Sequence, residues 1–223
     1  MKISHPKLTT VLQFRRQEIT SVVIEDKAFY EEFIVDIYNQ INRIEESMFF
    51  SEEDKIKNMD KEFDFIVSTF DLSYSDKKIQ KNLIKLLSDE IYESDISLRL
   101  LEAYSAISSA LEQLKLSCQY EIDYENDLII TDIFKNFNVN IEQPTGKFVE
   151  KLLDYIPNMH DLTGKDIFVI ANCDVFLEKE DYVHIEKMVK YHDVSVVFIR
   201  NEQIELPIYQ NEYIIDIDFC ELH

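Results

Sequence analysis

The chain has 223 residues, 46% of them hydrophobic, and carries 44 acidic against 23 basic side chains, for a formal net charge of −21 at pH 7. This length allows a sizeable core, as one large domain or one domain with an insertion. The charge argues against indiscriminate nucleic-acid binding, because the overall field repels phosphate, although a local basic surface stays open. No apolar run approaches a membrane span, no signal-peptide pattern opens the chain, and three scattered cysteines form no CxxC pair. We therefore expect a cytoplasmic protein with reduced thiols and no membrane segment.

The first block of the chain predicts strands and a helix. Ile19 to Ile24 is a run rich in β-branched residues, which is typical of a strand. The residues after it carry apolar side chains at helical spacing, at Phe29, Phe33, Ile37 and Ile41. A second short apolar strand is expected at Phe63–Val67.

The second block predicts a long helical hairpin from roughly Asp76 to Cys118. Ser75 or Asp76 is suited to cap its first helix, and Ser94-Asp95 offers a break and a new cap. Apolar side chains keep helical spacing at Ile79, Leu83, Leu86, Leu87 and Ile91, and then at Ile96, Leu100, Ala103, Ile107, Leu111 and Leu114. We expect residues 73–119 to form a protruding leg domain, inserted into a head domain of residues 1–72 and 120–223.

Basic residues gather in two stretches of this acidic chain. They are Lys55, Lys57 and Lys61 in the first, and Lys77, Lys78, Lys81 and Lys85 in the second. On a helix, Lys77, Lys81 and Lys85 recur every four residues and form one stripe. Such a stripe is either a solvated helix face or a phosphate-binding surface. Its affinity for a phosphate polymer rises if assembly brings several copies together.

The third block alternates helices and strands. A first helix is expected over residues 128–137, ending at Asn138, and a second helix carries Phe148, Leu152 and Ile156 and is stopped by Pro157. Strands are expected at Ile167–Ala171 and Val194–Ile199, with a helix at Lys179–Tyr191 between them. A last strand is expected at Tyr213–Ile217. A βαβ pattern of this kind implies right-handed crossovers. The predicted fold class is therefore α/β, with a mostly parallel sheet in the head and an inserted α-helical hairpin leg.

The segment from Glu121 to Asp127 places an acid at every second position with no basic residue beside it. In an extended backbone Glu121, Asp123, Glu125 and Asp127 would project from one side and repel one another. Oxygen-binding divalent cations relieve such repulsion, and calcium tolerates irregular carboxylate sets better than magnesium does. The alternative interpretation is a solvated acidic surface.

Motifs of catalysis are missing. Neither Gly146-Lys147 nor Gly164-Lys165 has the upstream glycine and following Ser or Thr of a phosphate loop, and the histidines and cysteines lack zinc spacing. No GxSxG elbow is present. Glu25-Asp26-Lys27 supplies a Glu-x-Lys triplet of the kind a metal-dependent nuclease uses, but such short triplets occur by chance in a highly charged chain. Two alternative functions remain open at this point. One is an acidic protein-binding scaffold, and the other, less favoured, is a metal-dependent nuclease.

Several short motifs together resemble the short form of the type II-A CRISPR-associated spacer-acquisition accessory protein family. They are Lys55-x-Lys57 and Lys61-Glu62 before a strand, Asp71 leading into a helix with Ile84-Lys85-Leu86-Leu87, the acid ladder, Asp132-Ile133-x-Lys135-x-x-x-Val139, Ile167-Phe168-Val169, and Asn172 with Phe176-Leu177-x-Lys179. The resemblance spans about Ile19 to Tyr213. Glycines that the family often carries after Asp71 and near Asn138 are replaced in this chain.

The resemblance implies a fold and a function. It implies a head like a P-loop nucleotide-binding fold without a working phosphate loop, a helical leg, and no enzymatic activity. It further implies a homotetrameric ring that binds Ca²⁺ and double-stranded DNA ends without sequence preference, and that acts in CRISPR adaptation with the integrase proteins and the effector nuclease. We expect the metal ligands to be Glu121, Asp123, Glu125, Asp127 and Asp132. We expect the DNA-binding residues to be Lys55, Lys57, Lys61, Lys81, Lys85 and Lys135.

Overall fold

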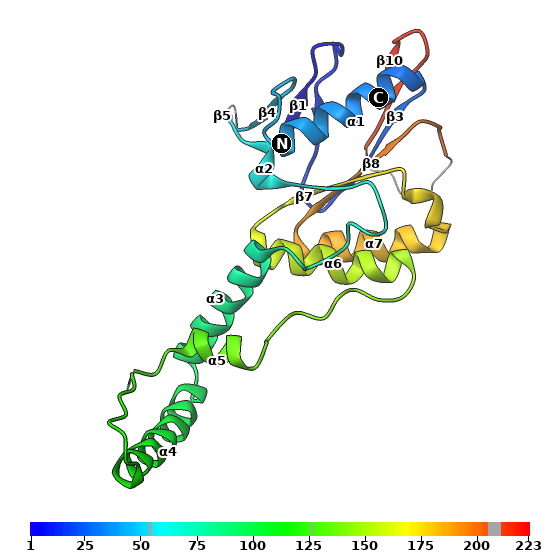
Figure 1. Cartoon of the computed structure of the whole chain (residues 1–223). Coiled ribbons are helices and arrows are strands. Elements are labelled where there is room, and N and C mark those ends of the chain that lie inside the picture. Colours follow the sequence, from blue (N-terminus) through cyan, green and yellow to red (C-terminus); the bar gives the residue numbers. More distant parts are fainter. Residues whose placement is uncertain (54, 126, 205–210) are drawn as a thin grey trace. The chain divides into compact units, whose positions relative to one another are not determined.

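The computed structural model describes residues 1–53, 55–125, 127–204 and 211–223 (Figure 1). The chain forms two compact units, the first from Met1–Ser73 and Gln143–His223 and the second from Tyr74–Glu142. Within the described ranges, no helix combines the length and the apolar character needed to cross a membrane.

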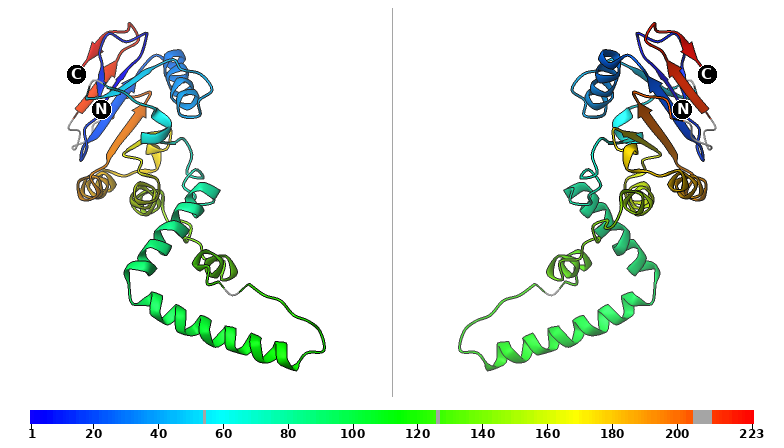
Figure 2. Two further views of the ribbon diagram at one scale, coloured as in Figure 1. Left: turned by 90° about the vertical axis from the view of Figure 1, so that its left-hand side faces the viewer. Right: turned by 90° about the vertical axis from the view of Figure 1, so that its right-hand side faces the viewer.

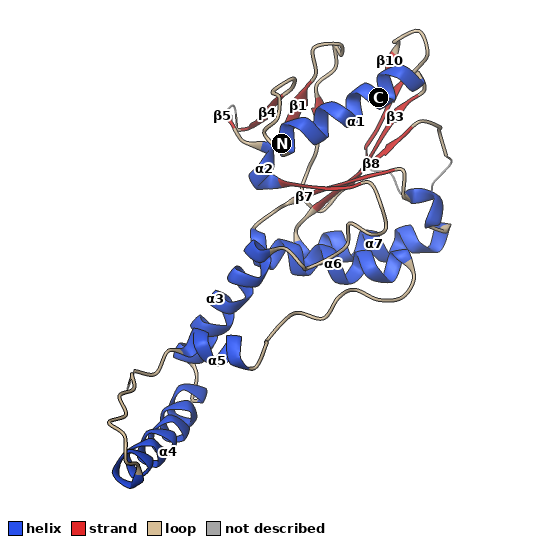
Figure 3. Ribbon diagram, in the orientation of Figure 1, coloured by secondary structure: helices blue, strands red, loops and turns tan. Residues whose placement is uncertain are grey.

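A six-stranded sheet forms the centre of the first unit (Figure 3). Its strands, in spatial order, are β10 (Glu221–Leu222), β9 (Asn211–Ile215), β3 (Ile19–Ile24), β8 (Ser195–Arg200), β7 (Ile167–Ala171) and β6 (Phe63–Ile66). All neighbours pair in parallel except β10 with β9. The predicted α/β class with a mostly parallel sheet is confirmed.

The two faces of this sheet are covered by different helices: α1 (Lys27–Ile41) on one, and α6 (Phe148–Thr163) and α7 (Lys179–His192) on the other (Figure 2). Every residue of β3, β7 and β8 is buried, as their unbroken apolar runs predict. Alternation of side chains divides the core between the faces. Val22 and Val197 pack with Phe33 of α1, whereas Phe198 contacts Tyr182 of α7 at a ring separation of 5.3 Å.

A second, four-stranded antiparallel sheet lies beside α1 and was not predicted from the sequence. Its order is β2 (Leu12–Gln13), β1 (Lys2–Ser4), β4 (Phe49–Glu52) and β5 (Lys55–Ile56), and the short helix α2 (Met59–Glu62) follows it. Ile3, Leu12 and Phe50 of this sheet join the core under α1. Strands of two to four residues are too short to show a periodicity, so no pattern indicated them.

Helix α6 corrects one prediction, because it continues through Pro157 to Thr163. A proline inside a helix removes one backbone hydrogen bond and costs roughly 3 kcal/mol. Met159 and Leu162, beyond the proline, are buried at 4% and 8% exposure, and Gly164 ends the helix in the left-handed conformation. Burial of these two side chains together with the glycine cap offsets the cost.

The second unit contains α3 (Lys77–Glu93), α4 (Ile96–Ser117) and α5 (Ile130–Asn136). Asp76 caps α3, accepting a hydrogen bond from the Lys78 amide at 2.6 Å. Helices α3 and α4 meet at an angle near Ser94 instead of lying side by side, and no residue of α4 is buried (Figure 2). The predicted packed hairpin is therefore not confirmed.

The second unit is longer than the leg expected at residues 73–119. It continues to Glu142 and includes α5. Ile130 of α5 is 7% exposed, and α5 packs against α3. This contact places α5 in the second unit, whose residues Tyr74–Glu142 also include the acid ladder.

Candidate nucleic-acid and metal-binding residues

The lysines of α3 are all exposed. Lys77, Lys78, Lys81 and Lys85 occupy the amino-terminal half of the helix, and no ion pair to them is found among the described residues. Lys81 and Lys85 stand one turn apart on the same face, whereas Ile79 and Ile91 are buried. The helix therefore presents a row of cations to solvent, backed by an anchored apolar face.

The charges of α3 are ordered against the helix dipole. The first turn has no acid and the last turn has no base, while Asp89, Glu90 and Glu93 all lie in the carboxyl-terminal half. Exposed charges near helix ends are worth about 0.3–1 kcal/mol each, and the favoured order is acids first and bases last. Helix stability does not explain this arrangement. It favours a role for the lysines in contacting an external anion.

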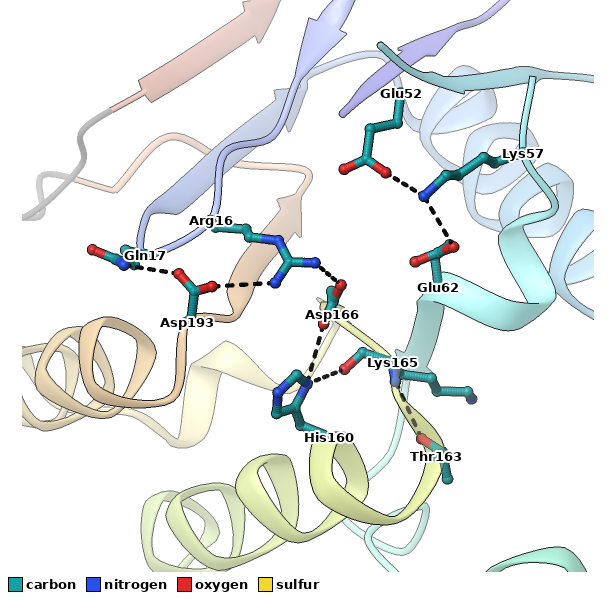
Figure 4. Close-up of polar contacts among 10 residues, drawn as sticks. All are labelled: Arg16, Gln17, Glu52, Lys57, Glu62, His160, Thr163, Lys165, Asp166 and Asp193. Atoms are coloured by element: carbon teal, nitrogen blue, oxygen red, sulfur yellow. Dashed lines mark hydrogen bonds and ion pairs between the residues drawn. The ribbon is translucent and has the colours of Figure 1, made fainter. Parts of the chain in front are cut away.

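The three lysines near α2 differ in their surroundings. Lys55 on β5 and Lys61 on α2 are exposed. Lys57 bonds to Glu52 and lies 3.4 Å from Glu62 (Figure 4). The Lys57 hydrogen bond lowers the pKa of the Glu52 carboxyl, and the same bond raises the pKa of Lys57. Lys57 thus holds β4 to α2 in this structure.

The acid ladder lies in an irregular segment between α4 and α5. Glu121, Asp123 and Glu125 are exposed, while Ile122 and Tyr124 between them are partly buried. The Tyr124 hydroxyl donates to Glu112 Oε1 at 2.5 Å, which raises the pKa of Tyr124 to about 12 and ties this segment to α4.

The described residues contain no group of three or more His, Cys, Asp or Glu side chains close enough to hold a metal ion. Asp127 is exposed, and Asp132 on α5 is half-exposed. Asp132 Oδ1 accepts a hydrogen bond from Lys135 Nζ at 2.7 Å. The structure therefore pairs a residue expected to bind metal with one expected to bind DNA.

Comparison with known proteins decides the family. Residues 38–219 match the family described as CRISPR-associated protein (Cas_Csn2). The chain belongs to the CRISPR-associated Csn2 family. The resemblance predicted from the sequence is confirmed.

Two similar Csn2-family proteins are both named CRISPR-associated protein Csn2. The one from Streptococcus agalactiae is 26% identical over 224 residues, covering 98% of this chain and 96% of the relative. The one from Enterococcus faecalis is 22% identical over 102 residues, or 45% of each chain. A putative ABC-transporter ATP-binding protein from Pyrococcus furiosus aligns over 95% of this chain and 97% of its own, with 9% identity and a TM-score of 0.38.

Helix α4 of this Csn2-family chain carries an apolar seam whose exposure the sequence did not reveal. Six side chains recur at alternating intervals of four and three residues, the spacing of a coiled-coil seam: Ile96, Leu100, Ala103, Ile107, Ala110 and Leu114. Ile107 is 57% and Leu114 is 52% exposed. A helix this apolar is normally covered by a partner.

The turn between β3 and α1 is where a phosphate loop would begin in a nucleotide-binding sheet. Here Glu25-Asp26 stand at that point with no glycine, and Asp26 Oδ1 accepts a hydrogen bond from the Phe29 amide at 2.7 Å. A carboxylate thus takes the helix terminus that would otherwise attract phosphate.

The opposite, amino-terminal edge of the sheet is tied by ion pairs that the sequence did not predict (Figure 4). Arg16 pairs with Asp166 and lies 3.2 Å from Asp193, and His160 Nδ1 lies 3.1 Å from Asp166 Oδ1. Hydrogen bonds from Gln17 and Arg16 lower the pKa of Asp193. These charges join β3, β7, β8 and α6, and so they serve the fold of the first unit.

Proposed function

We propose that this Csn2-family chain is a non-catalytic protein that binds double-stranded DNA ends without sequence preference. It acts as a calcium-stabilised homotetrameric ring in type II-A CRISPR adaptation, the acquisition of new spacers. Its partners there are the CRISPR integrase proteins and the effector nuclease. Family membership supports the setting, and the unpaired lysine row of α3 carries the DNA-binding part of the proposal.

A short row of lysines is sufficient to bind DNA if assembly repeats the row in several subunits. One subunit offers Lys81 and Lys85 on one face of α3, with Lys55 and Lys61 exposed on the first unit. Four copies around a hole present each lysine four times, and contacts to one DNA molecule reinforce one another. Because the contacts are to phosphate, binding is independent of base sequence and falls steeply with salt.

The apolar seam of α4 supports self-assembly. Five of its six side chains are exposed in the single chain, and Leu100 is partly buried. The 22-residue helix bears only four charged side chains, Arg99, Glu102, Glu112 and Lys115. A second copy of the chain offers an identical apolar surface, as symmetric oligomers require. Assembly through α4 would bury this surface and repeat the lysine rows in a fixed geometry.

Calcium would act on the second unit by replacing Lys135 as the partner of Asp132. Binding of Ca²⁺ by Asp123, Glu125 and Asp132 would gather the carboxylates and remove Asp132 from Lys135. The Asp132–Lys135 pair is exposed, so its loss costs at most about 1 kcal/mol. Lys135 would then be available to phosphate. In this mechanism the metal both draws the segment together and releases a cation.

The absence of a catalytic role is supported by the β3–α1 turn, where Asp26 caps the helix and no glycine allows close approach of phosphate. The mostly parallel sheet, with helices on both faces, supports a head similar to nucleotide-binding folds, here without a phosphate loop.

The proposal is tested by topology-dependent binding. With Ca²⁺, the protein should retard a linear duplex but not a closed circle of the same sequence, and cutting the circle should restore retardation. Particle mass should equal four chains. Equal retardation of both forms would point to ordinary surface binding, and magnesium-dependent cleavage of either form would replace the proposal with a nuclease.

A further inference from the structure

A pocket of about 330 Å³ opens at the carboxyl ends of β3, β7 and β8 in the first unit, far in sequence from the residues assigned to DNA or metal. Its polar lining comes from three segments, which are helix α1, the residues after β7, and the end of β8 with the residues after it: Tyr30, Asn172, Asp174, Arg200, Asn201 and Glu202. In open α/β sheets this edge is where ligands bind, at the point where successive connections turn to opposite sides. Here β3 lies between β8 and β9, so the chain crosses from one side of β3 to the other after β8.

The floor of the pocket is a buried ion pair. Arg200 and Asp174 are 3% and 8% exposed, and Arg200 Nε bonds to Asp174. The guanidinium also donates to the Tyr182 hydroxyl at 2.8 Å and stands 5.1 Å from the Phe198 ring centre. Arg200 is thus fixed and its charge balanced. Arg200 therefore lines the pocket without acting as a receptor for anions.

The rest of the lining is rich in acceptors. The Tyr30 hydroxyl donates to Asn172 Oδ1 at 2.7 Å, and Asn201 Nδ2 donates to Ile24 O at 2.9 Å. No hydrogen bond to the Asn201 side-chain oxygen is found among the described residues, so this oxygen can accept one from a ligand. Glu202 is exposed, and no cation pairs with it within the described residues.

The electrostatic balance of this edge is negative. Burial and the charge of Asp174 raise the pKa of Tyr30 to about 12, and burial with Asp71 and Asp174 raises that of Cys173 to about 11. With Arg200 balanced by Asp174, Glu202 leaves the lining with a net negative charge. An anion such as phosphate is disfavoured here, and a cation is favoured.

We propose that this pocket receives an arginine side chain presented by a protein partner. A planar guanidinium has donors in several directions to match the Asn201 oxygen and the Glu202 carboxylate, and it stacks on an aromatic ring such as that of Tyr30. Val175 and Ile204, 75% and 42% exposed, offer apolar surface at the rim for the methylene stem. The volume lies at the small end of ligand pockets, which suits a single side chain better than a nucleotide.

The test is a titration of the whole protein with N-acetyl-L-arginine amide, followed by NMR of the backbone amides and of the Val175 and Ile204 methyl groups. The shifts should centre on the pocket and saturate on the order of millimolar ligand. N-acetyl-L-citrulline amide has nearly the same shape without the charge, and it should bind at least fivefold more weakly. Free L-arginine should bind no more tightly than the capped form.

Two variants of equal charge change complete the test. E202Q should weaken N-acetyl-L-arginine amide about three- to fivefold, as expected for one exposed ion pair. D161N, on the exposed side of α6 near the other edge of the sheet, should leave it unchanged. Equal binding of citrulline amide, shifts with adenosine or inorganic phosphate in place of arginine, tighter binding of free L-arginine, or no shift at all would each overturn the proposal. None of these outcomes depends on whether the second unit binds DNA.

Discussion

Replacing Lys81 and Lys85 by glutamine should strongly weaken DNA binding while leaving the fold intact. Both side chains are exposed and lie beyond the first turn of α3, so their charges contribute little to helix stability and the melting temperature should stay unchanged or rise slightly. Each phosphate contact contributes roughly 0.9 to the slope of log K against log salt. Loss of two contacts therefore weakens binding by about 60-fold at roughly 0.1 M salt, and loss of more contacts around a ring weakens it further.

The assay is fluorescence anisotropy of a linear duplex across a series of NaCl concentrations, with Ca²⁺ constant. The slope should fall by about 2 or more in K81Q/K85Q. The control K179Q/K187Q removes two exposed lysines of α7 and leaves the same net charge. An unchanged slope in K81Q/K85Q, or an equal loss in the α7 control, would refute the assignment of the α3 row.

Three further outcomes are expected. D123A/E125A should abolish the mass difference between protein with Ca²⁺ and with chelator, measured by light scattering. I107E should shift the particle toward monomer with little loss of monomer stability, because Ile107 is 57% exposed in the single chain. Cys173, which is buried and whose pKa is raised to about 11, should resist iodoacetamide at pH 8, while exposed Cys118 reacts; equal rates by mass spectrometry would contradict the burial.

Matched controls separate these effects from general damage. E90A/E93A removes two exposed carboxylates from the same unit and should preserve the response to Ca²⁺; if it too loses the response, the ladder has no special role. S109E adds the same charge to α4 outside the seam and should leave the mass unchanged. An unchanged mass in I107E would remove the seam from the assembly.

The sequence predicted long, uniform elements well because one physical signal dominated each of them. The β-branched runs gave β3 and β7 to the residue, and aspartate before a basic, apolar-periodic stretch gave the start of α3. The proline in α6 misled the prediction, since the compensating burial of Met159 and Leu162 is a property of the packed unit. Sheet β2-β1-β4-β5 was not predicted because its strands have only two to four residues, and its two local pairs are joined by a β1–β4 pairing between residues about 50 positions apart.

Site residues were harder to predict for a related reason. Spacing alone singled out the carboxylates of the ladder, but spacing does not say whether the backbone gathers them. Spacing also does not show which lysines form ion pairs with carboxylates. Lys57 lies between Glu52 and Glu62, and Lys135 bonds to Asp132, so two of the six lysines expected at DNA already have carboxylate partners.

That division among the lysines is itself informative in a chain with 44 acids and 23 bases. Where carboxylates outnumber cations, an exposed lysine has many opportunities for an ion pair. Asp89 follows Lys85 by one helical turn, a spacing at which such pairs form, yet no ion pair joins them in the structure. Lys77 and Lys78 stand in the first turn of α3, where cations are least favoured, and Lys81 and Lys85 continue the row beyond it. A row of exposed lysines without carboxylate partners fits the proposed binding of an external polyanion. Tests of DNA binding should therefore begin with the lysines of α3 and end with Lys57, which already bridges two carboxylates.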